Sequence, residues 1–177
     1  DDPTRVLPPG EVGEIRIKGP NVTRGYWNKP EGSADAFVDG RFLTGDIGYV
    51  DTDGYFFLVD RKKDMIISGG FNVYPQMIEQ AIYTMSGVHE VIVLGIPDQY
   101  RGEAAKAFIK LKPGAKPFSL DELRAQLTGK LGKHELPAAV EFVDDLPRTP
   151  VGKLSRHELR QQQKPSQSTK TASGARS

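Results

Sequence analysis

The stretch Val59-Asp60-Arg61-Lys62-Lys63-Asp64-Met65-Ile66-Ile67-Ser68-Gly69-Gly70-Phe71-Asn72-Val73-Tyr74-Pro75 divides the chain into two kinds of sequence. It joins a run of charged residues to an apolar β-like run, a glycine pair and a turn proline. Charged side chains of both signs are poor material for a core, because burying an unpaired charge is costly. Glycine pairs are typical of places where the backbone turns tightly or approaches a ligand closely. Taken alone, the stretch predicts a solvated loop, a strand and a tight turn.

The sequence before this stretch carries the signals of β-strands. Residues 12–18 alternate apolar with charged side chains, a pattern typical of a half-buried strand. Strand-like runs at 41–50 and 55–60 are joined by Asp51-Thr52-Asp53-Gly54, and an Asp-Gly pair between apolar runs is a strong hairpin signal. The same four residues resemble part of a calcium loop, but the closing glutamate of such a loop is missing. We therefore predict a β-hairpin or partial β-barrel unit, the end of a larger domain, over residues 1–61.

After the junction the signals become mixed α and β. Two capping-box patterns, Ser119-x-x-Glu122 and Ser155-x-x-Glu158, predict the starts of two helices. The other expected elements are a short hairpin, a helix and three strands, at 65–74, 75–85, 88–96, 104–111 and 139–143. The predicted class is α+β: the β unit is followed by a small α/β domain with a short hairpin and a mixed three-stranded sheet, over residues 62–160.

The last residues, 161–177, form a run of Gln, Ser, Thr and Lys with no acidic residue and almost nothing apolar. Such a segment cannot bury enough surface to offset the entropy lost on ordering. We predict a disordered tail.

The composition excludes several classes of function. The formal net charge of +1 gives no reason to expect bulk electrostatic capture of nucleic acid. The absence of cysteine excludes disulfides, thiolate metal sites and a cysteine nucleophile, and it fits a cytoplasmic location. No apolar run is long enough to cross a bilayer. His89, His134 and His157 lie far apart without metal-ligand spacing, so we expect no metal site. The chain begins without methionine, and we expect it to be a piece of a longer protein.

Four features are candidates for chemistry, and one of them is the charged run Arg61-Lys62-Lys63-Asp64. Asp46 follows a glycine at the start of a strand, where its carboxylate could accept hydrogen bonds from two vicinal ribose hydroxyls. The pair Gly69-Gly70 does not meet the dinucleotide fingerprint, which needs three spaced glycines. Gly152-Lys153 is not a Walker A loop, because Leu154 follows the lysine. What remains there is a long-armed cation on a proline-stiffened loop.

These features, taken in order, resemble the adenylate-forming superfamily of acyl- and aryl-CoA synthetases, firefly luciferase and peptide-synthetase adenylation domains. Four of its signatures are matched, by residues 13–27, 44–54, 60–75 and 146–156. The resemblance covers residues 10–160. The amino-acid sequence of the third signature is most similar to that of bacterial fatty-acyl-CoA ligases. The family joins a carboxylic acid to MgATP as an acyl adenylate and then transfers the acyl group to coenzyme A.

The resemblance implies a role for seven residues. Asp46 and Arg61 match the residues that contact the ribose of ATP or AMP, and Lys63 matches the hinge about which the C-terminal domain rotates between half-reactions. Lys153 matches the catalytic lysine of the adenylation step. The coenzyme A path is matched by Gly69, Gly70 and Phe71.

The resemblance also implies what lies elsewhere. The phosphate loop, the ligands of Mg²⁺ and the acyl pocket are expected before Asp1, so we predict that the chain alone is inactive.

Two alternatives stay open. In the first, the domain serves as a regulatory module: a protein lysine acetyltransferase acylates Lys153, helped by an exposed Arg148 and Arg156, and so removes a charge that the reaction needs. Alternatively, the parent enzyme uses an acceptor other than coenzyme A, for example a carrier protein.

Overall fold

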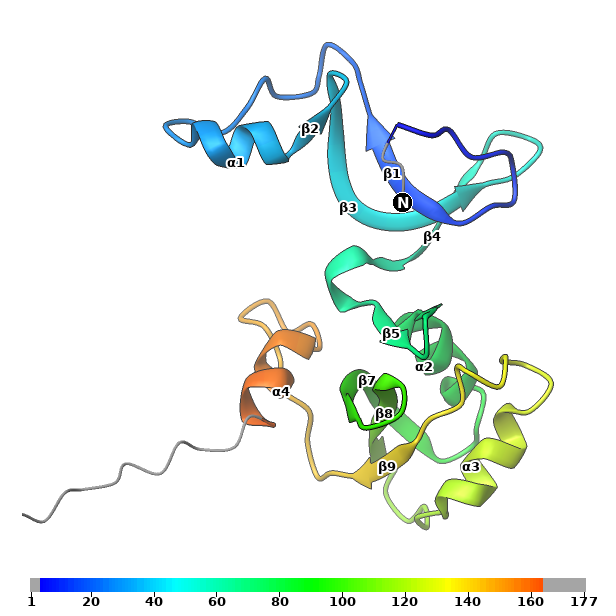
Figure 1. Cartoon of the computed structure of the whole chain (residues 1–177). Helices are drawn as coiled ribbons and strands as arrows, with labels where there is room; N and C mark the ends of the chain where they lie inside the picture. The colour runs from blue at the N-terminus through cyan, green and yellow to red at the C-terminus, as the bar shows by residue number, and fades with distance from the viewer. Residues whose placement is uncertain (1–3, 164–177) are drawn as a thin grey trace, which may run out of the picture.

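The structure, a computed structural model, describes residues 4–163. Its strands form two sheets, which Figure 1 draws one above the other with the short 3₁₀ turn η1, Lys62–Asp64, between them. The charged junction therefore lies where the two sheets meet. None of the described helices is long and apolar enough to cross a membrane.

The first sheet is antiparallel and is built around the long strand β3, Arg41–Val50. Its other strands are β1, β2 and β4, at Gly13–Ile17, Phe37–Val38 and Phe56–Arg61, and each of them pairs with β3. The expected hairpin turn is confirmed: the Asp51 carboxylate accepts hydrogen bonds from the backbone N–H groups of Asp53 and Tyr55, and Gly54 has a φ of +88°. The described strands form an open sheet and do not close into a barrel.

One element of this unit was not predicted. Helix α1, Pro30–Asp35, follows the turn-rich segment that precedes β2. Its first residue is a proline and its first turn carries Glu31, which are both weak helix-start signals. With six residues the helix is too short to produce an apolar periodicity in the sequence.

The second sheet has five strands in the order β6-β5-β8-β7, with β9 parallel to β8. Their bounds are Ile66–Ser68 for β5, Phe71–Val73 for β6, Val88–Asp98 for β7, Gly102–Leu111 for β8 and Ala139–Phe142 for β9. The expected mixed three-stranded sheet is confirmed as β7, β8 and β9. The expected hairpin is also confirmed, and it extends the same sheet through the pair Ser68–Gly102.

Both faces of this sheet are covered, because successive strand residues point to opposite sides. Helices α2, Pro75–Tyr83, and α3, Leu120–Leu127, pack on one face and bury Ile78, Ile82, Leu123 and Leu127 against β7 and β8. The opposite face holds a smaller cluster around Phe108, which includes Leu159 of helix α4, Arg156–Gln162. Figure 1 draws α4 on the other side of the sheet from α3.

The predicted helix caps are confirmed. The Ser119 side chain accepts a hydrogen bond from the Glu122 N–H while the Glu122 carboxylate accepts one from the Ser119 N–H. Ser155 likewise accepts from the N–H of Glu158. The prediction of disorder from residue 161 was wrong at its start, because Gln161 and Gln162 continue α4 on the register set by that cap. Residues 164–177 of the predicted tail lie outside the described residues.

Truncation of Phe108 is expected to destabilise the second unit strongly. Its side chain is fully buried, so Phe108→Ala removes apolar contacts from a closed core and should lower the free energy of unfolding by about 3–5 kcal/mol. Urea denaturation followed by circular dichroism measures this change. The control is Tyr100→Ala, whose side chain is 96% exposed and whose loss should leave the midpoint unchanged. Equal midpoints for the two variants would contradict the assignment of Phe108 to the core.

Candidate functional site

The fold brings Asp46 and Arg61 together. They are cross-strand partners on β3 and β4, and the Arg61 Nε atom donates to Asp46 Oδ1 at 2.9 Å. The Thr44 hydroxyl accepts a hydrogen bond from the N–H of Asp46 and donates to the carbonyl of Ile15, which fixes the backbone at the carboxylate. Both charged side chains stay partly exposed, at 35% for Asp46 and 53% for Arg61. An acceptor and a donor therefore lie side by side at the surface.

The first and the last residue of η1 are held by different units. The Lys62 ammonium donates to Glu14 of the first sheet at 2.7 Å. Asp64 is buried and pairs with Arg156 and Arg160 of α4, in the second unit. Between them Lys63 is exposed, and within residues 4–163 its side chain makes no hydrogen bond or ion pair. The side-chain contacts of η1 therefore change from the first unit to the second across a single residue, Lys63.

A cluster of charged side chains, which we call the junction charge cluster, consists of Asp60, Asp64, Glu79, Arg156 and Arg160. Its centre is Arg156, which contacts Glu79 through two hydrogen bonds and lies 3.6 Å from Asp60 and 3.8 Å from Asp64. Burial alone would lower the pKa of Arg156, but the three carboxylates outweigh it and raise the pKa above its ordinary value. The guanidinium is therefore permanently charged.

Asp60 is the member of this cluster that lies before Lys63. Its side chain is fully buried, and its Oδ1 accepts a hydrogen bond from the Arg61 N–H at 2.7 Å. Its Oδ2 accepts one from the N–H of Gln76, in the first turn of α2, also at 2.7 Å. Asp60 thus satisfies an open donor of a helix that follows the junction, at the end where a negative charge is favourable.

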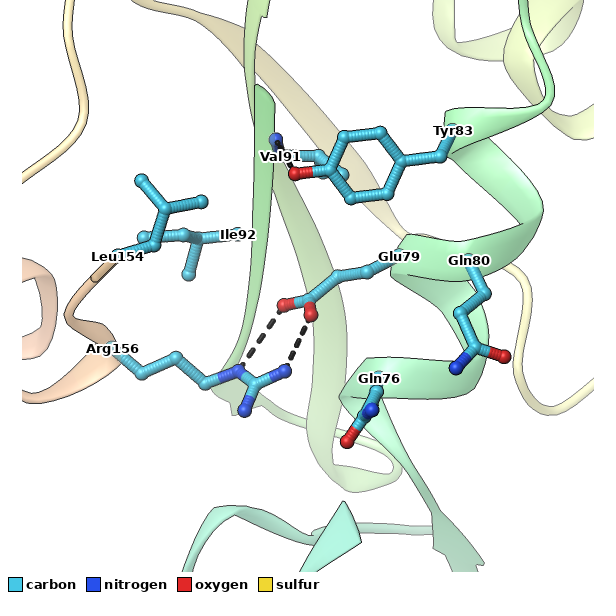
Figure 2. Close-up of a pocket in the computed structure, with 8 residues that line it drawn as sticks. All are labelled: Gln76, Glu79, Gln80, Tyr83, Val91, Ile92, Leu154 and Arg156. Carbon is cyan, nitrogen blue, oxygen red and sulfur yellow. Dashed lines mark hydrogen bonds and ion pairs between the residues drawn. The ribbon is translucent and has the colours of Figure 1, made fainter. Parts of the chain in front are cut away.

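Figure 2 shows the bidentate contact between Arg156 and Glu79 at one side of a depression of about 310 Å³ between α2 and β7. In the same view the Tyr83 hydroxyl accepts a hydrogen bond from the N–H of Val91. The remaining lining residues are Gln76, Gln80, Ile92 and Leu154. Glu79, Arg156 and the Tyr83 hydroxyl are paired within the protein itself, which favours a structural role for this depression.

The glycine pair forms the turn between β5 and β6. Gly69 and Gly70 have φ values of +59° and +84°, so both residues occupy the left-handed region that side chains rarely adopt. A hairpin turn with two such residues is the type favoured by the twist of the strands. Phe71, directly after the turn, is 57% exposed and stacks on His134 with ring centroids 4.7 Å apart. The turn and the two rings form one exposed surface.

A second depression, of about 400 Å³, lies beside this turn. The carbonyl of Arg101 accepts a hydrogen bond from the N–H of Gly69 at 2.8 Å, and the same arginine lines the depression together with Arg124 and Lys133. The other lining residues are Thr128, Leu131 and Leu136, so basic side chains are present without an acidic one. Such a surface suits an anionic group.

Lys153 lies in a tight loop between β9 and α4. The N–H of Thr149 donates to the Lys153 carbonyl at 2.7 Å, and the N–H of Lys153 donates to the Thr149 hydroxyl at 3.2 Å. Gly152 has a φ of +83°, which lets the chain reverse just before the lysine. The lysine side chain is exposed, and within the part of the chain that is described no hydrogen bond or ion pair joins it to Asp46 or Arg61.

Arg148 and Arg156 were expected to be exposed and to help an acetyltransferase recognise Lys153. Arg148 is exposed as expected, at 41%, although it is paired with Glu90. The expectation was wrong for Arg156, whose side chain is only 20% exposed and is held in the junction charge cluster. The reason is that both arginines lie within reach of carboxylates on α2 and β7, which the sequence separates by more than fifty residues. The acetyltransferase partner is not supported by any comparison below.

Residues 77–153 match the family model of the AMP-binding enzyme C-terminal domain. The chain is 50% identical over 151 residues to the long-chain-fatty-acid–CoA ligase of Bacillus subtilis. The aligned residues make up 85% of this chain and 27% of the ligase. It is 46% identical to the fatty acid–[acyl-carrier-protein] ligase ScoC of Streptomyces coeruleorubidus, over 90% of this chain and 31% of ScoC.

Among solved structures, ATP-bound MatB of Rhodopseudomonas palustris superposes with a TM-score of 0.82 at 43% identity, over 88% of this chain and 31% of MatB. Apo MatB covers the same shares at 44% identity, but its TM-score is 0.65. Because the two comparisons cover the same share of the same protein, this structure is arranged more like the ATP-bound MatB than like the apo MatB.

An open β unit, a junction held from both sides and a five-stranded unit that presents a glycine turn and a lysine loop make up the fold that this chain shares with these AMP-binding enzymes. The chain belongs to the AMP-binding enzymes, and residues 77–153 are a C-terminal domain of that family. It spans about 30% of the length of the relatives that it matches.

Sequence reasoning did not find the junction charge cluster or the stacking of His134 on Phe71. Asp60 and Asp64 gave no individual signal, because a carboxylate within or beside a charged run is most simply interpreted as solvated. A weak signal was available for Glu79, which stands between the apolar residues Ile78 and Ile82 of the helix. The described residues contain no group of three or more His, Cys, Asp or Glu side chains that could hold a metal ion.

Proposed function

We propose that this chain is the terminal part of an AMP-forming acyl-CoA synthetase that activates a fatty acid. The enzyme converts the carboxylic acid and ATP to an acyl adenylate and pyrophosphate, and then transfers the acyl group to the thiol of coenzyme A with release of AMP. The observation that carries this proposal is the likeness to ATP-bound MatB over 88% of the chain at 43% identity. The 50% identity to a long-chain-fatty-acid–CoA ligase favours a fatty acid as the substrate class.

The Asp46–Arg61 pair fits the ribose of the nucleotide. The Asp46 carboxylate can accept hydrogen bonds from two vicinal hydroxyls, and the Arg61 guanidinium, which now donates to Asp46 Oδ1, orients the carboxylate and has further donors to offer. We assign Mg²⁺ to the part of the enzyme that precedes this chain, together with the phosphates. When bound, the ion would neutralise charge on the phosphate oxygens.

Lys63 is proposed as the hinge between the two half-reactions. Support comes from the side-chain contacts of η1, which change from one unit to the other. Lys62 is bound to Glu14 of the first sheet, and Asp64 is bound to Arg156 and Arg160 of the second unit. A residue between these two anchors can absorb a change in backbone dihedral angles without breaking either of them, while the contacts of Asp60 with Gln76 and Arg156 would have to open. The proposed domain boundary at residues 61–62 lies within two residues of this change of contacts.

Gly69, Gly70 and Phe71 are proposed to line the path of coenzyme A. The glycine turn allows a close approach to the backbone, since a Cβ atom at either glycine would meet open space rather than protein. The depression beside it, lined by Arg101, Arg124 and Lys133, suits the phosphates of the coenzyme. We place the enzyme in the cytoplasm, as the cysteine-free composition predicted.

The first sheet supports the presence of a larger partner domain. Tyr55, Phe56 and Leu58 on and beside β4 are each more than 60% exposed, and Trp27 is 93% exposed. Three large apolar side chains exposed within residues 55–58 are unusual on a free surface. We propose that the preceding part of the enzyme covers it.

The proposal is tested with the full-length protein in a coupled assay for pyrophosphate and AMP. We expect ATP-dependent pyrophosphate release with fatty acids, and coenzyme A-dependent appearance of AMP and acyl-CoA. The isolated chain should release no pyrophosphate, because the phosphate and acyl sites lie outside it. Pyrophosphate release without acyl transfer to coenzyme A, but with transfer to an acyl carrier protein, would assign the protein to the carrier-loading class. No pyrophosphate with any carboxylic acid would overturn the proposal.

A further inference from the structure

We propose that Arg148 and Arg156 are positioning residues that clamp the Lys153 loop to the body of the second unit. This inference rests on the proposed function, because it concerns how the lysine is placed for the adenylation step. Lys153 lies between the two arginines, five residues after one and three residues before the other. Each arginine reaches a carboxylate on a different element, so the loop is held at both ends.

The loop is well ordered internally. Besides the two Thr149–Lys153 hydrogen bonds, the N–H of Gly152 donates to the Thr149 carbonyl at 2.8 Å, and the N–H of Ser155 donates to the Pro147 carbonyl at 2.8 Å. These bonds fix the shape of the loop, but each of them joins two residues of the loop itself. They leave its place on the rest of the protein undetermined.

Arg148 fixes the first end of the loop. Its Nη1 atom donates to the carbonyl of Gly152 at 3.0 Å, directly before Lys153, and its Nη2 atom donates to Oε1 of Glu90 on β7. The Glu90 side chain is only 14% exposed, and its Oε2 atom is buried without a hydrogen-bond partner in the described residues. A buried carboxylate with one unsatisfied oxygen depends strongly on its remaining cation. The Arg148 contact is therefore structurally important.

Arg156 fixes the second end. Its Nε atom donates to Glu79 Oε1 at 3.1 Å, and the same oxygen accepts a hydrogen bond from the N–H of Val93 on β7 at 2.8 Å. Glu79 on α2 is thus also bound to strand β7, independently of the arginine. The planar guanidinium binds this carboxylate with two donors at once, a geometry that an ammonium cannot reproduce.

The clamp matters because the lysine arm is flexible. Four methylene groups separate its ammonium from the backbone, so the arm alone does not determine where the charge lies. The ammonium must meet the reacting oxygens within hydrogen-bond distance, and a displacement of about 1 Å can reduce a rate about a hundredfold. A loop held at both ends limits the region that the ammonium explores. If the loop were held at one end only, the Lys153 ammonium would explore a larger volume.

The test measures the two half-reactions separately in the full-length protein. Arg148→Ala and Arg156→Lys should each lower kcat for pyrophosphate release by about tenfold or more, with KM for ATP unchanged within about twofold. Thioester formation from supplied acyl adenylate should stay within twofold of the unchanged protein, because it does not use Lys153. The exchange Arg148→Glu with Glu90→Arg should recover part of the lost rate.

The matched control is Lys130→Ala. The Lys130 ammonium donates to the Thr84 hydroxyl at 2.8 Å in the same unit, and among the described residues no hydrogen bond or ion pair joins either side chain to the Lys153 loop, so both half-reactions should be unchanged. Hydrogen exchange on the chain itself gives a second readout: Arg148→Ala should speed exchange at the amides of Gly152 and Lys153 while the amides of β7 and β8 keep their protection. If Arg148→Ala does not fold, Arg148→Lys is measured in its place.

The outcomes separate the clamp from the proposed function. If Lys153→Ala leaves pyrophosphate release intact, the proposed function fails and the clamp has no role in this reaction. If Lys153→Ala abolishes the release while the arginine variants leave it unchanged, the clamp alone is overturned. Equal losses in both half-reactions, or loss of protection throughout β7 and β8, would assign the arginines to general stability and would also overturn it.

Discussion

Lys153→Ala in the full-length protein is expected to lower the rate of pyrophosphate release by about a hundredfold or more. Attack of a carboxylate on the α-phosphate of ATP accumulates negative charge at the reacting oxygens, and a preplaced ammonium stabilises that charge where water is excluded. The Lys153 side chain is exposed and no partner competes for it among the described residues, so the ammonium is free to serve this purpose. Thioester formation from supplied acyl adenylate should continue.

The control for this experiment is Lys116→Ala, which removes an exposed ammonium elsewhere in the same unit. It should change neither half-reaction. Lys153→Arg adds a finer comparison, because it keeps the charge and changes its shape and reach. Pyrophosphate release by Lys153→Ala at a rate near that of the unchanged protein would rule out this residue as the catalytic lysine, whatever the behaviour of the thioester step.

Lys63→Pro is expected to slow thioester formation by about tenfold or more while adenylation is reduced much less, because a restricted hinge penalises one of two domain orientations. Proline fixes φ near −65° and removes the backbone N–H, which limits rotation at the one residue of η1 that has no side-chain partner among the described residues. This structure resembles ATP-bound MatB more closely than apo MatB, so the adenylating arrangement should be the one retained.

The matched variant Lys63→Ala removes the same side chain and leaves the backbone free. It should affect both half-reactions less than the proline variant does. Both rates are measured in single-turnover experiments, one started with ATP and the acid, the other with acyl adenylate and coenzyme A. A proline variant that loses both activities to the same extent would indicate damage to the fold at Asp60 or Asp64 instead of a restricted hinge.

The fold could be predicted from the sequence wherever the signal was local. The Asp51–Gly54 turn and the Ser119 cap depend on residues only a few positions apart, and both formed as expected. Helix α1 was missed because six residues give no periodicity. The attachment of the β5–β6 hairpin to the second sheet depends on one pair, Ser68 with Gly102, which no local pattern indicates.

The same distinction between local and long-range signals holds for the candidate site. Asp46 and Arg61 were each assigned from motif resemblance, and the hairpin between them brings them into contact across two adjacent strands. The Arg156–Glu79 contact joins residues 77 positions apart, and it formed because a helix and a loop distant in the sequence pack on the same strand. Sequence patterns specify which residue types are present, whereas such pairings arise only when the tertiary packing is complete.

The junction charge cluster also determines how the end of the chain unfolds. Helix α4 has seven residues, a length at which an isolated helix is not stable in water. Opening it alone would remove Arg156 from buried carboxylates on β4, η1 and α2, and Arg160 from one of them. Leaving those charges uncompensated costs several kcal/mol, on the order of the stability of a small domain. Local fraying of this terminal helix is therefore suppressed, and α4 belongs to the same cooperative unfolding unit as the core of the sheet that it covers.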